Sequence, residues 1–372
     1  MKIGVDAGTL RHTLTGIGWY LWQVLQELAK TADKDSIYLY APRSLTICPH
    51  GKNIHLRTGR SYLPGSFWLQ IQGRAVVRQD SLDCFWGPAH ILPLDLPSSV
   101  RTVITVHDLV WLLYPETMAR YNVFVHKFFF ERSVCRANAI IADSEQTKRD
   151  LVTKLGVQES RVTVIHGGVE DMFRPIPSEL VHSRLQGIGI TGDYILSVGT
   201  LEPRKNYPLL FRAFAQLRKG LTLVVVGQKG WKYRNILQEI DRLGLQDRLR
   251  LLQYVPTEDL VTLYNGARFL VMPSIYEGFG LPILQAMACG TPVLASNCSS
   301  LPEVGGNTVV YFNPMSVESL TVKMSNLLTN ESLRAEMRKK GLLRARQFTW
   351  QRTAKKTLTL LRDRPCPQGS PI

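Results

Sequence analysis

Apolar and polar positions alternate regularly along the first half of the chain. Short apolar runs predict β-strands, and stretches in which apolar residues recur every three or four positions predict helices. The expected strands cover residues 2–6, 36–41, 83–86, 102–106, 139–142 and 162–165, and the expected helices cover 19–29, 121–137 and 145–155. Because strands and helices alternate, we expect a parallel sheet with helices on both faces.

The second half of the chain restarts the same alternation. The expected strands cover residues 194–198, 222–226, 249–252, 267–272, 293–295 and 309–311, and the expected helices cover 207–217, 236–243, 258–265, 282–288, 317–328 and 333–347. The predicted fold class is therefore α/β. A chain of 372 residues suits about two domains, each able to bury its own core.

Glycine, proline and charged residues cluster near 167–177, which indicates a domain boundary there. We expect one α/β domain over 1–170 and a second over 171–348. A final helix is expected over 349–364, and the proline-rich end, 365–372, is expected to be a disordered tail.

The formal charge of +15 is concentrated in the second half of the chain. Residues 173–372 hold 26 basic and 14 acidic residues, a net +12, whereas residues 1–172 hold 19 and 16, a net +3. Such an imbalance marks a nucleic-acid face, an anionic membrane surface or a solvated helix face. No recognition motif accompanies the charge, so no nucleic-acid partner is expected. A membrane contact would use Lys339, Lys340, Lys355 and Lys356.

Cysteine usage and hydropathy indicate the cellular compartment in which the protein is expected. The six cysteines form no CxxC pair and no metal-ligand spacing, which is typical of reduced cytosolic thiols. No window approaches ~18 consecutive apolar residues, and the first five residues enter a strand without a signal-peptide layout. We therefore expect a cytoplasmic protein, and a peripheral position at the inner face of the membrane stays open.

The stretch Pro273–Val293 carries the strongest chemical pattern. A strand gives way to a loop with Glu277, Gly278 and Gly280, and Pro282 then suits the first turn of a helix. A glycine-bearing loop that feeds a helix N-terminus offers free N–H groups and the positive end of the helix dipole, which suits a phosphate. The alternative is an ordinary strand–loop–helix junction.

Two further strand ends carry candidate side chains. Arg204 and Lys205 follow the strand at 194–198, where Arg can grip two oxygens of a diphosphate and Lys adds a compact charge. The alternative for this pair is a solvated turn. His107 follows the uncharged strand at 102–106, where it could bind a hydroxyl or exchange a proton, or serve as a satisfied structural residue.

Two other segments are open to more than one interpretation. Gly16 and Gly18 stand in a loop before the first predicted helix, where they would let the backbone approach a ligand or simply make a tight turn. The GxGxxG fingerprint is absent, because Leu21 stands where its third glycine would fall. The aromatic segment Phe124–Phe130 is expected to belong to the core; if exposed, it would be a membrane-docking patch.

The chain as a whole resembles glycosyltransferase family 4. The run EGFGLPILQAMACGTP at 277–292 resembles the donor-site signature of that family, and 199–206, His107-Asp108-Leu109 and 15–18 resemble its other landmarks in the right order. The resemblance implies the GT-B fold, with two facing Rossmann-like domains and a cleft between them. It also implies that the final helix crosses back to the N-terminal domain.

The resemblance further implies a role for each candidate residue. Arg204 and Lys205 would neutralise the donor diphosphate, and Glu277 would approach the transferred sugar. The backbone of Phe279, Gly280 and Leu281 would contact sugar and phosphate. His107 would sit by the sugar on the opposite wall, and the loop of Gly16 and Gly18 would close against the diphosphate.

One position departs from the family pattern. Gln285 stands where the family usually has a second glutamate, which holds the ribose hydroxyls. Glutamine keeps one acceptor and adds donors, so a ribose contact as neutral hydrogen bonds remains feasible. Weaker donor binding or a changed nucleotide preference is the expected consequence.

The predicted function is that of a retaining, metal-independent hexosyltransferase without a cofactor. Its partners would be a nucleotide sugar and a glycan or lipid-linked glycan acceptor. His107-Asp108-Leu109 followed by Tyr114-Pro-Glu116 resembles the mannosyl- and rhamnosyltransferase-like members, which suggests GDP-mannose as donor. The alternatives are another GT-B enzyme, such as an epimerase or phosphorylase, or a non-catalytic sugar-nucleotide-binding protein.

Overall fold

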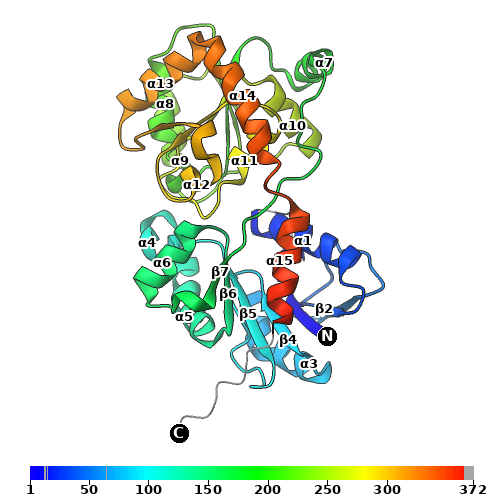
Figure 1. Cartoon of the computed structure of the whole chain (residues 1–372). Coiled ribbons are helices and arrows are strands. Elements are labelled where there is room, and N and C mark those ends of the chain that lie inside the picture. Colours follow the sequence, from blue (N-terminus) through cyan, green and yellow to red (C-terminus); the bar gives the residue numbers. More distant parts are fainter. Residues whose placement is uncertain (12–13, 15, 64, 364–372) are drawn as a thin grey trace. The chain divides into compact units, whose positions relative to one another are not determined.

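The computed structural model describes residues 1–11, 14, 16–63 and 65–363 (Figure 1). The chain forms two compact units. The first unit contains Met1–Leu113, Arg120–Gly167 and the chain from Trp350 onward, and the second contains Tyr114–Ala119 and Gly168–Thr349. The expected tail at 365–372 lies outside the described residues.

A seven-stranded sheet forms the centre of the first unit, and every neighbouring pair of strands is parallel. The strand order is β3-β2-β1-β4-β5-β6-β7. The strands are β1 (Lys2–Asp6), β2 (Ser36–Ala41), β3 (Ile54–Thr58), β4 (Cys84–Gly87), β5 (Arg101–Val106), β6 (Ala139–Ala142) and β7 (Val162–Val164). The sequence pattern missed β3, an edge strand whose half-exposed side chains form no continuous apolar run.

Helices of the first unit connect these strands. They are η1 (Gly8–Arg11), α1 (Gly16–Thr31), α2 (Gly65–Trp68), η2 (Leu69–Gly73), α3 (Arg74–Gln79), α4 (Val110–Leu113), α5 (Arg120–Arg136), α6 (Glu145–Leu155), η4 (Glu159–Arg161) and α15 (Trp350–Arg362). The helix α6 shows how the sequence sets such an element. Ser144 accepts a hydrogen bond from the Thr147 N–H at its start, and Gly156 ends it in the left-handed conformation with φ 64°.

The second unit has a six-stranded sheet, again with parallel neighbours, in the order β10-β9-β8-β11-β12-β13. Its strands are β8 (Tyr194–Val198), β9 (Thr222–Val226), β10 (Leu249–Leu252), β11 (Leu270–Met272), β12 (Val293–Ser296) and β13 (Val310–Phe312). Its helices are η3 (Pro115–Thr117), α7 (Ser178–Ile188), η5 (Pro203–Lys205), α8 (Tyr207–Ala215), α9 (Tyr233–Arg242), α10 (Thr257–Gly266), α11 (Leu281–Ala288), α12 (Leu301–Gly305), η6 (Gly306–Thr308), α13 (Val317–Thr329) and α14 (Glu331–Ala345).

The central strands of this sheet are buried on both faces. Successive residues of β8 point to opposite sides, so Ile195 packs in one hydrophobic cluster and Leu196 in the other. The first cluster includes Phe211 of α8, and the second includes Ile283 of α11. This two-sided burial explains why the strands read as continuous apolar runs in the sequence.

The last helix, α15, belongs to the first unit although it follows the second in sequence. Trp350 and Leu361 are buried, and the Trp350 ring lies 5.9 Å from that of Tyr20 in α1. Arg362 Nε donates to Asp35 Oδ2 at 3.0 Å, and the Met1 ammonium donates to Asp35 Oδ1 at 3.0 Å. Figure 1 shows this helix, coloured red, beside the blue and cyan elements of the N-terminal half. None of the described helices has the length and apolar character needed to cross a membrane.

Candidate functional site

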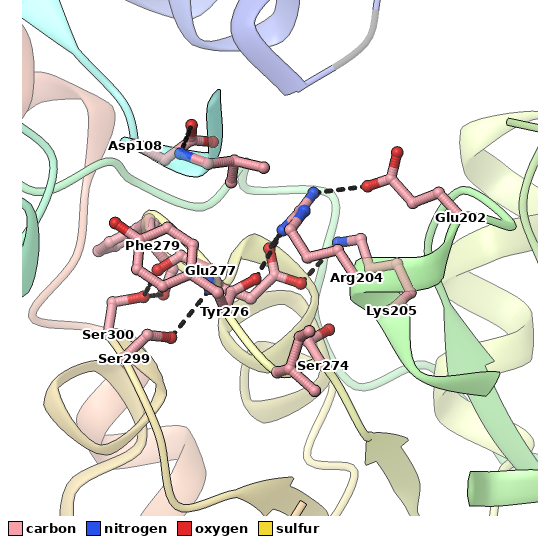
Figure 2. A network of polar contacts seen from close by, with 12 residues as sticks. Asp108, Glu202, Arg204, Lys205, Ser274, Tyr276, Glu277, Phe279, Ser299 and Ser300 are labelled. Atoms are coloured by element: carbon pink, nitrogen blue, oxygen red, sulfur yellow. Dashed lines mark hydrogen bonds and ion pairs between the residues drawn. The ribbon is translucent and has the colours of Figure 1, made fainter. Parts of the chain in front are cut away.

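A buried carboxylate held by two cations is the centre of the candidate site in the second unit (Figure 2). Arg204 Nη1 donates to Glu277 Oε2 at 2.7 Å, and Lys205 Nζ donates to Glu277 Oε1 at 2.6 Å. The cations come from η5, directly after β8, and Glu277 comes from the loop after β11. The carboxyl ends of adjacent parallel strands meet at one edge of a sheet, which brings these loops together.

Electrostatics keep Glu277 ionised. Burial alone disfavours the carboxylate, but the charges of Arg204 and Lys205 outweigh burial and lower the pKa of Glu277 to about 2. Arg204 also donates to Glu202 Oε1 at 2.7 Å and to the Tyr276 carbonyl oxygen at 2.8 Å. Two cations therefore face two carboxylates. An incoming anion would compete with those carboxylates for Arg204 and Lys205.

Backbone contacts fix the loop that carries Glu277. The Glu277 N–H donates to Ser299 Oγ at 2.9 Å, and the Ser300 hydroxyl lies 2.9 Å from the carbonyl oxygens of both Glu277 and Phe279. The Ile275 N–H donates to the Arg204 carbonyl oxygen at 2.9 Å, which ties this loop to η5. Ser299 and Ser300 were not predicted as site residues, although both follow the end of β12, where polar residues after a buried strand were a usable signal.

The loop leads directly into α11. Gly280 takes a φ of 106° before the first helical residue, Leu281, and Pro282 lies in the first turn as predicted. A Cβ on Gly280 would lie 2.9 Å from Leu301 Cδ2, so both backbone conformation and space favour glycine. The Phe279 side chain is buried and packs 6.0 Å from the ring of Phe348. The N-terminal end of α11 therefore follows the Glu277 loop directly.

Gln285 lies further along the same helix. Its Oε1 accepts a hydrogen bond from the Tyr264 hydroxyl at 3.1 Å. Tyr264 is fully buried, and burial raises the pKa of its phenol far above the ordinary value, so the phenol remains a donor. The amide oxygen of Gln285 is thus oriented by a neutral partner in α10.

His107 is tightly held in the first unit. Its Nδ1 lies 2.5 Å from Asp143 Oδ2, and its Nε2 lies 2.7 Å from the Pro88 carbonyl oxygen. Burial alone disfavours the imidazolium, but the Asp143 carboxylate outweighs burial and raises the pKa of His107. Both partners are acceptors, so they suit a doubly protonated ring. This arrangement engages both nitrogens within the first unit.

Gly16 and Gly18 do not stand in a loop. Both lie in the first turn of α1, which begins at Gly16, so the prediction of a loop over these residues was wrong. The helix starts earlier because a glycine is accepted in a first turn, where few intrahelical bonds depend on it. Gly18 is buried, and a Cβ there would lie 3.0 Å from Leu14 Cδ2. Close packing therefore accounts for Gly18.

The structure brings one group of the predicted residues together in the second unit: Arg204, Lys205, Glu277, Phe279, Gly280, Leu281 and Gln285. His107, Gly16 and Gly18 belong to the first unit. Among the described residues, no group of three or more His, Cys, Asp or Glu side chains is placed to hold a metal ion.

Two family models match separate parts of the chain and together cover most of it. The model described as Glycosyltransferase Family 4 matches residues 14–172, and the model described as Glycosyl transferases group 1 matches residues 185–344. The chain belongs to glycosyltransferase family 4. The predicted family is thus confirmed.

Curated relatives of this glycosyltransferase include mannosyltransferases. It is 29% identical to O-antigen chain mannosyltransferase B of Escherichia coli, over 96% of its own chain and 98% of that protein. It is 32% identical to the serotype-specific mannosyltransferase WbdA of Escherichia coli, over 68% of its own chain but only 32% of that longer protein. The prediction of a hexosyltransferase is confirmed at this level.

A solved structure resembles the glycosyltransferase in its overall fold. Sucrose-phosphate synthase from Thermosynechococcus elongatus matches with a TM-score of 0.79 at 19% identity, over 97% of this chain and 98% of that one. With a parallel Rossmann-like sheet in each unit, this likeness confirms the predicted GT-B fold.

Proposed function

We propose that this glycosyltransferase transfers mannose from GDP-mannose to a glycan or lipid-linked glycan acceptor, with retention at the anomeric carbon and without a metal. The observation that carries the proposal is the pair Arg204 and Lys205 on the buried Glu277. Mannose is supported by the two mannosyltransferase relatives and by the Tyr114-Pro-Glu116 motif. We place the reaction in the cytoplasm, with a peripheral contact at an anionic membrane surface.

Charge stabilisation at the leaving group is the main task of the site. When the bond between the anomeric carbon and the diphosphate oxygen breaks, negative charge grows on the nucleoside diphosphate. Arg204, Lys205 and the N-terminal N–H groups of α11 are arranged to stabilise that charge. They exchange a carboxylate partner for the diphosphate, so little reorganisation is needed.

Glu277 is unsuited to act as a general acid. Its pKa of about 2 keeps it ionised at neutral pH, so it can only accept hydrogen bonds from sugar hydroxyls. The acceptor hydroxyl oxygen then attacks the anomeric carbon on the face that the diphosphate leaves. Its proton passes to an oxygen of the departing phosphate, and this transfer balances the step without a protein base.

Replacement of Arg204 tests the site. Arg204→Ala should lower kcat/KM for mannosyl transfer by about 10²–10³, because one donor to the developing charge is lost. The matched control is Arg212→Ala, which removes a guanidinium paired with Glu239 elsewhere in the same unit. Near-normal rates for Arg204→Ala, with an unchanged melting temperature, would remove this residue from the site.

The donor is tested by binding. A thermal-shift screen against GDP-mannose and the corresponding UDP, ADP and dTDP sugars should show the largest stabilisation with GDP-mannose, since a ligand stabilises only the state that binds it. A shift with UDP sugars alone would contradict the mannose assignment. Turnover of the nucleotide sugar with no acceptor dependence would contradict transfer itself.

A further inference from the structure

Helix α5 exposes a row of aromatic side chains in the first unit. Tyr121 is 56% exposed, Phe124 is 62% exposed and Phe128 is 44% exposed. Their spacing of three and four residues puts them on one side of the helix. We call these three residues the α5 face. The prediction that Phe124–Phe130 belongs to the core was wrong for Phe124 and Phe128 and right for Phe129 and Phe130, which are buried.

The opposite side of α5 holds this face in place. Val125 and Phe129 are buried in a cluster with Ile91, and the Phe129 ring lies 5.4 Å from that of Phe67. The rings of Phe124 and Phe128 lie 6.4 Å apart and are nearly parallel, with an interplanar angle of 18°. The exposed rings are therefore preformed on an anchored helix, and presenting them to a partner costs little ordering.

Helix α5 carries a net positive charge, and one of its cations contacts the α5 face. The helix carries Arg120, Lys127, Arg132 and Arg136 against the single acid Glu131, a formal net charge of +3 with histidine neutral. The Arg132 guanidinium carbon lies 4.2 Å from the centre of the Phe128 ring, and Arg132 Nη1 donates to the Phe128 carbonyl oxygen at 2.6 Å. A cation is thus stacked on one of the exposed rings.

We propose that the α5 face docks the first unit on an anionic lipid surface. Aromatic rings favour the boundary between headgroups and acyl chains, and neighbouring Arg and Lys side chains favour anionic headgroups. Both requirements meet on this single helix. The inference rests on the proposed function only in that a lipid-linked acceptor would lie at the same surface.

A second basic surface must be distinguished from this one. The lysines that the sequence analysis connected with a membrane lie on other helices, Lys339 and Lys340 on α14 and Lys355 and Lys356 on α15. All four are exposed, and Lys340 pairs with Glu336 at 2.5 Å. Binding by charge alone would be lost at high salt, whereas binding that buries aromatic rings retains a salt-resistant part.

Vesicle co-sedimentation of the full chain tests the proposal. The wild-type protein should bind vesicles of mixed phosphatidylglycerol and phosphatidylcholine more tightly than vesicles of pure phosphatidylcholine. The double variant Phe124→Gln/Phe128→Gln should bind about tenfold more weakly or worse, because two apolar rings no longer leave water. The matched control Val322→Gln/Leu343→Gln changes two similarly exposed apolar residues on α13 and α14 and should bind like wild type.

Phe124→Trp adds a direct reporter of burial. Its emission, measured as the difference from wild type, should shift to the blue on anionic vesicles and be quenched by brominated lipid. The assay contains neither donor nor acceptor, so its outcome is independent of sugar transfer.

Three results would overturn the proposal. The first is wild-type affinity of the Phe124→Gln/Phe128→Gln variant. The second is complete loss of vesicle binding when the four lysines of α14 and α15 are replaced by glutamine and α5 is intact. The third is self-association of the wild type that the double variant abolishes, without vesicle binding, which would make the α5 face a contact between protein copies.

Discussion

At the scale of single residues, Gln285 distinguishes this glycosyltransferase from the usual family pattern. The structure gives its Oε1 a partner, the Tyr264 hydroxyl, which would serve a glutamate oxygen equally well. Glutamine therefore fits the local hydrogen bonds without a special adjustment. The glutamine should therefore change the affinity for the ligand rather than the stability of the fold.

Gln285→Glu should preserve or strengthen donor binding. A charge-assisted bond to a ribose hydroxyl exceeds a neutral one by ~1 kcal/mol, which corresponds to about fivefold in Kd. Calorimetric titration with GDP measures the change, and Gln285→Ala serves as the variant that removes the acceptor. A large loss of affinity in Gln285→Glu would show that the ribose contact is misassigned.

The ionised state of Glu277 predicts how the free energy of unfolding depends on pH in acid. Its folded-state pKa of about 2 lies below the ordinary value of 4.5, so its contribution to stability is complete above pH 4.5 and disappears as the pH falls towards 2. Urea titrations over that window should show the free energy of unfolding of wild type falling more steeply than that of Glu277→Gln. The control is Glu336→Gln, since that carboxylate is exposed and its pair with Lys340 is screened by solvent. Equal slopes for Glu277→Gln and wild type would contradict this role of Glu277.

The sequence predicted Arg204, Lys205 and Glu277 as separate site residues but not the ion pairs between them. Each residue could be predicted from its side-chain type and from its position after an apolar strand. Their pairing requires two loops to meet at one edge of the sheet. Glu277 is 73 residues from Arg204 and 72 residues from Lys205 in the sequence, and no local pattern shows that such distant residues meet. For the same reason, the pattern could not show that both nitrogens of His107 are engaged by Asp143 and Pro88.

At the scale of elements, periodicity recovered most strands and the long helices. Strands buried on both faces, such as β5 and β9, read as unbroken apolar runs, so their prediction was straightforward. The edge strand β3 and the early start of α1 were missed, because solvent exposure and glycine weaken the apolar signal. Helix α5 shows the reverse error, in which aromatic content was taken for burial.

The burial of one side of α15 predicts that its apolar residues stabilise the first unit. Leu361 is fully buried, so Leu361→Ala should destabilise the first unit by ~2–5 kcal/mol through lost contacts and a cavity. Hydrogen exchange should become faster in α1 and α15 and remain unchanged in α8 of the second unit. Leu343→Ala, at an exposed position of α14, is the matched control. Faster exchange confined to the second unit would contradict the assignment of α15 to the first.

At the scale of the whole molecule, the chain passes between the two units several times. Besides the passages near Gly167 and Thr349, the short segment Tyr114–Ala119 belongs to the second unit although it lies between α4 and α5 of the first. The Tyr114 ring lies 5.5 Å from that of Tyr276, and Lys232 Nζ donates to the Glu116 carbonyl oxygen at 3.2 Å. Apolar periodicity could not reveal this excursion, because six residues are too few to form a periodic pattern.

The passage of α15 back to the first unit has a consequence for synthesis on the ribosome. The second unit has its full sequence once Thr349 has been added, but the first unit still lacks α15 at that moment. Domains usually fold in the order in which they emerge. Here the unit that emerges first is completed last, so a nascent chain exposes the apolar surface of α1 until α15 has emerged.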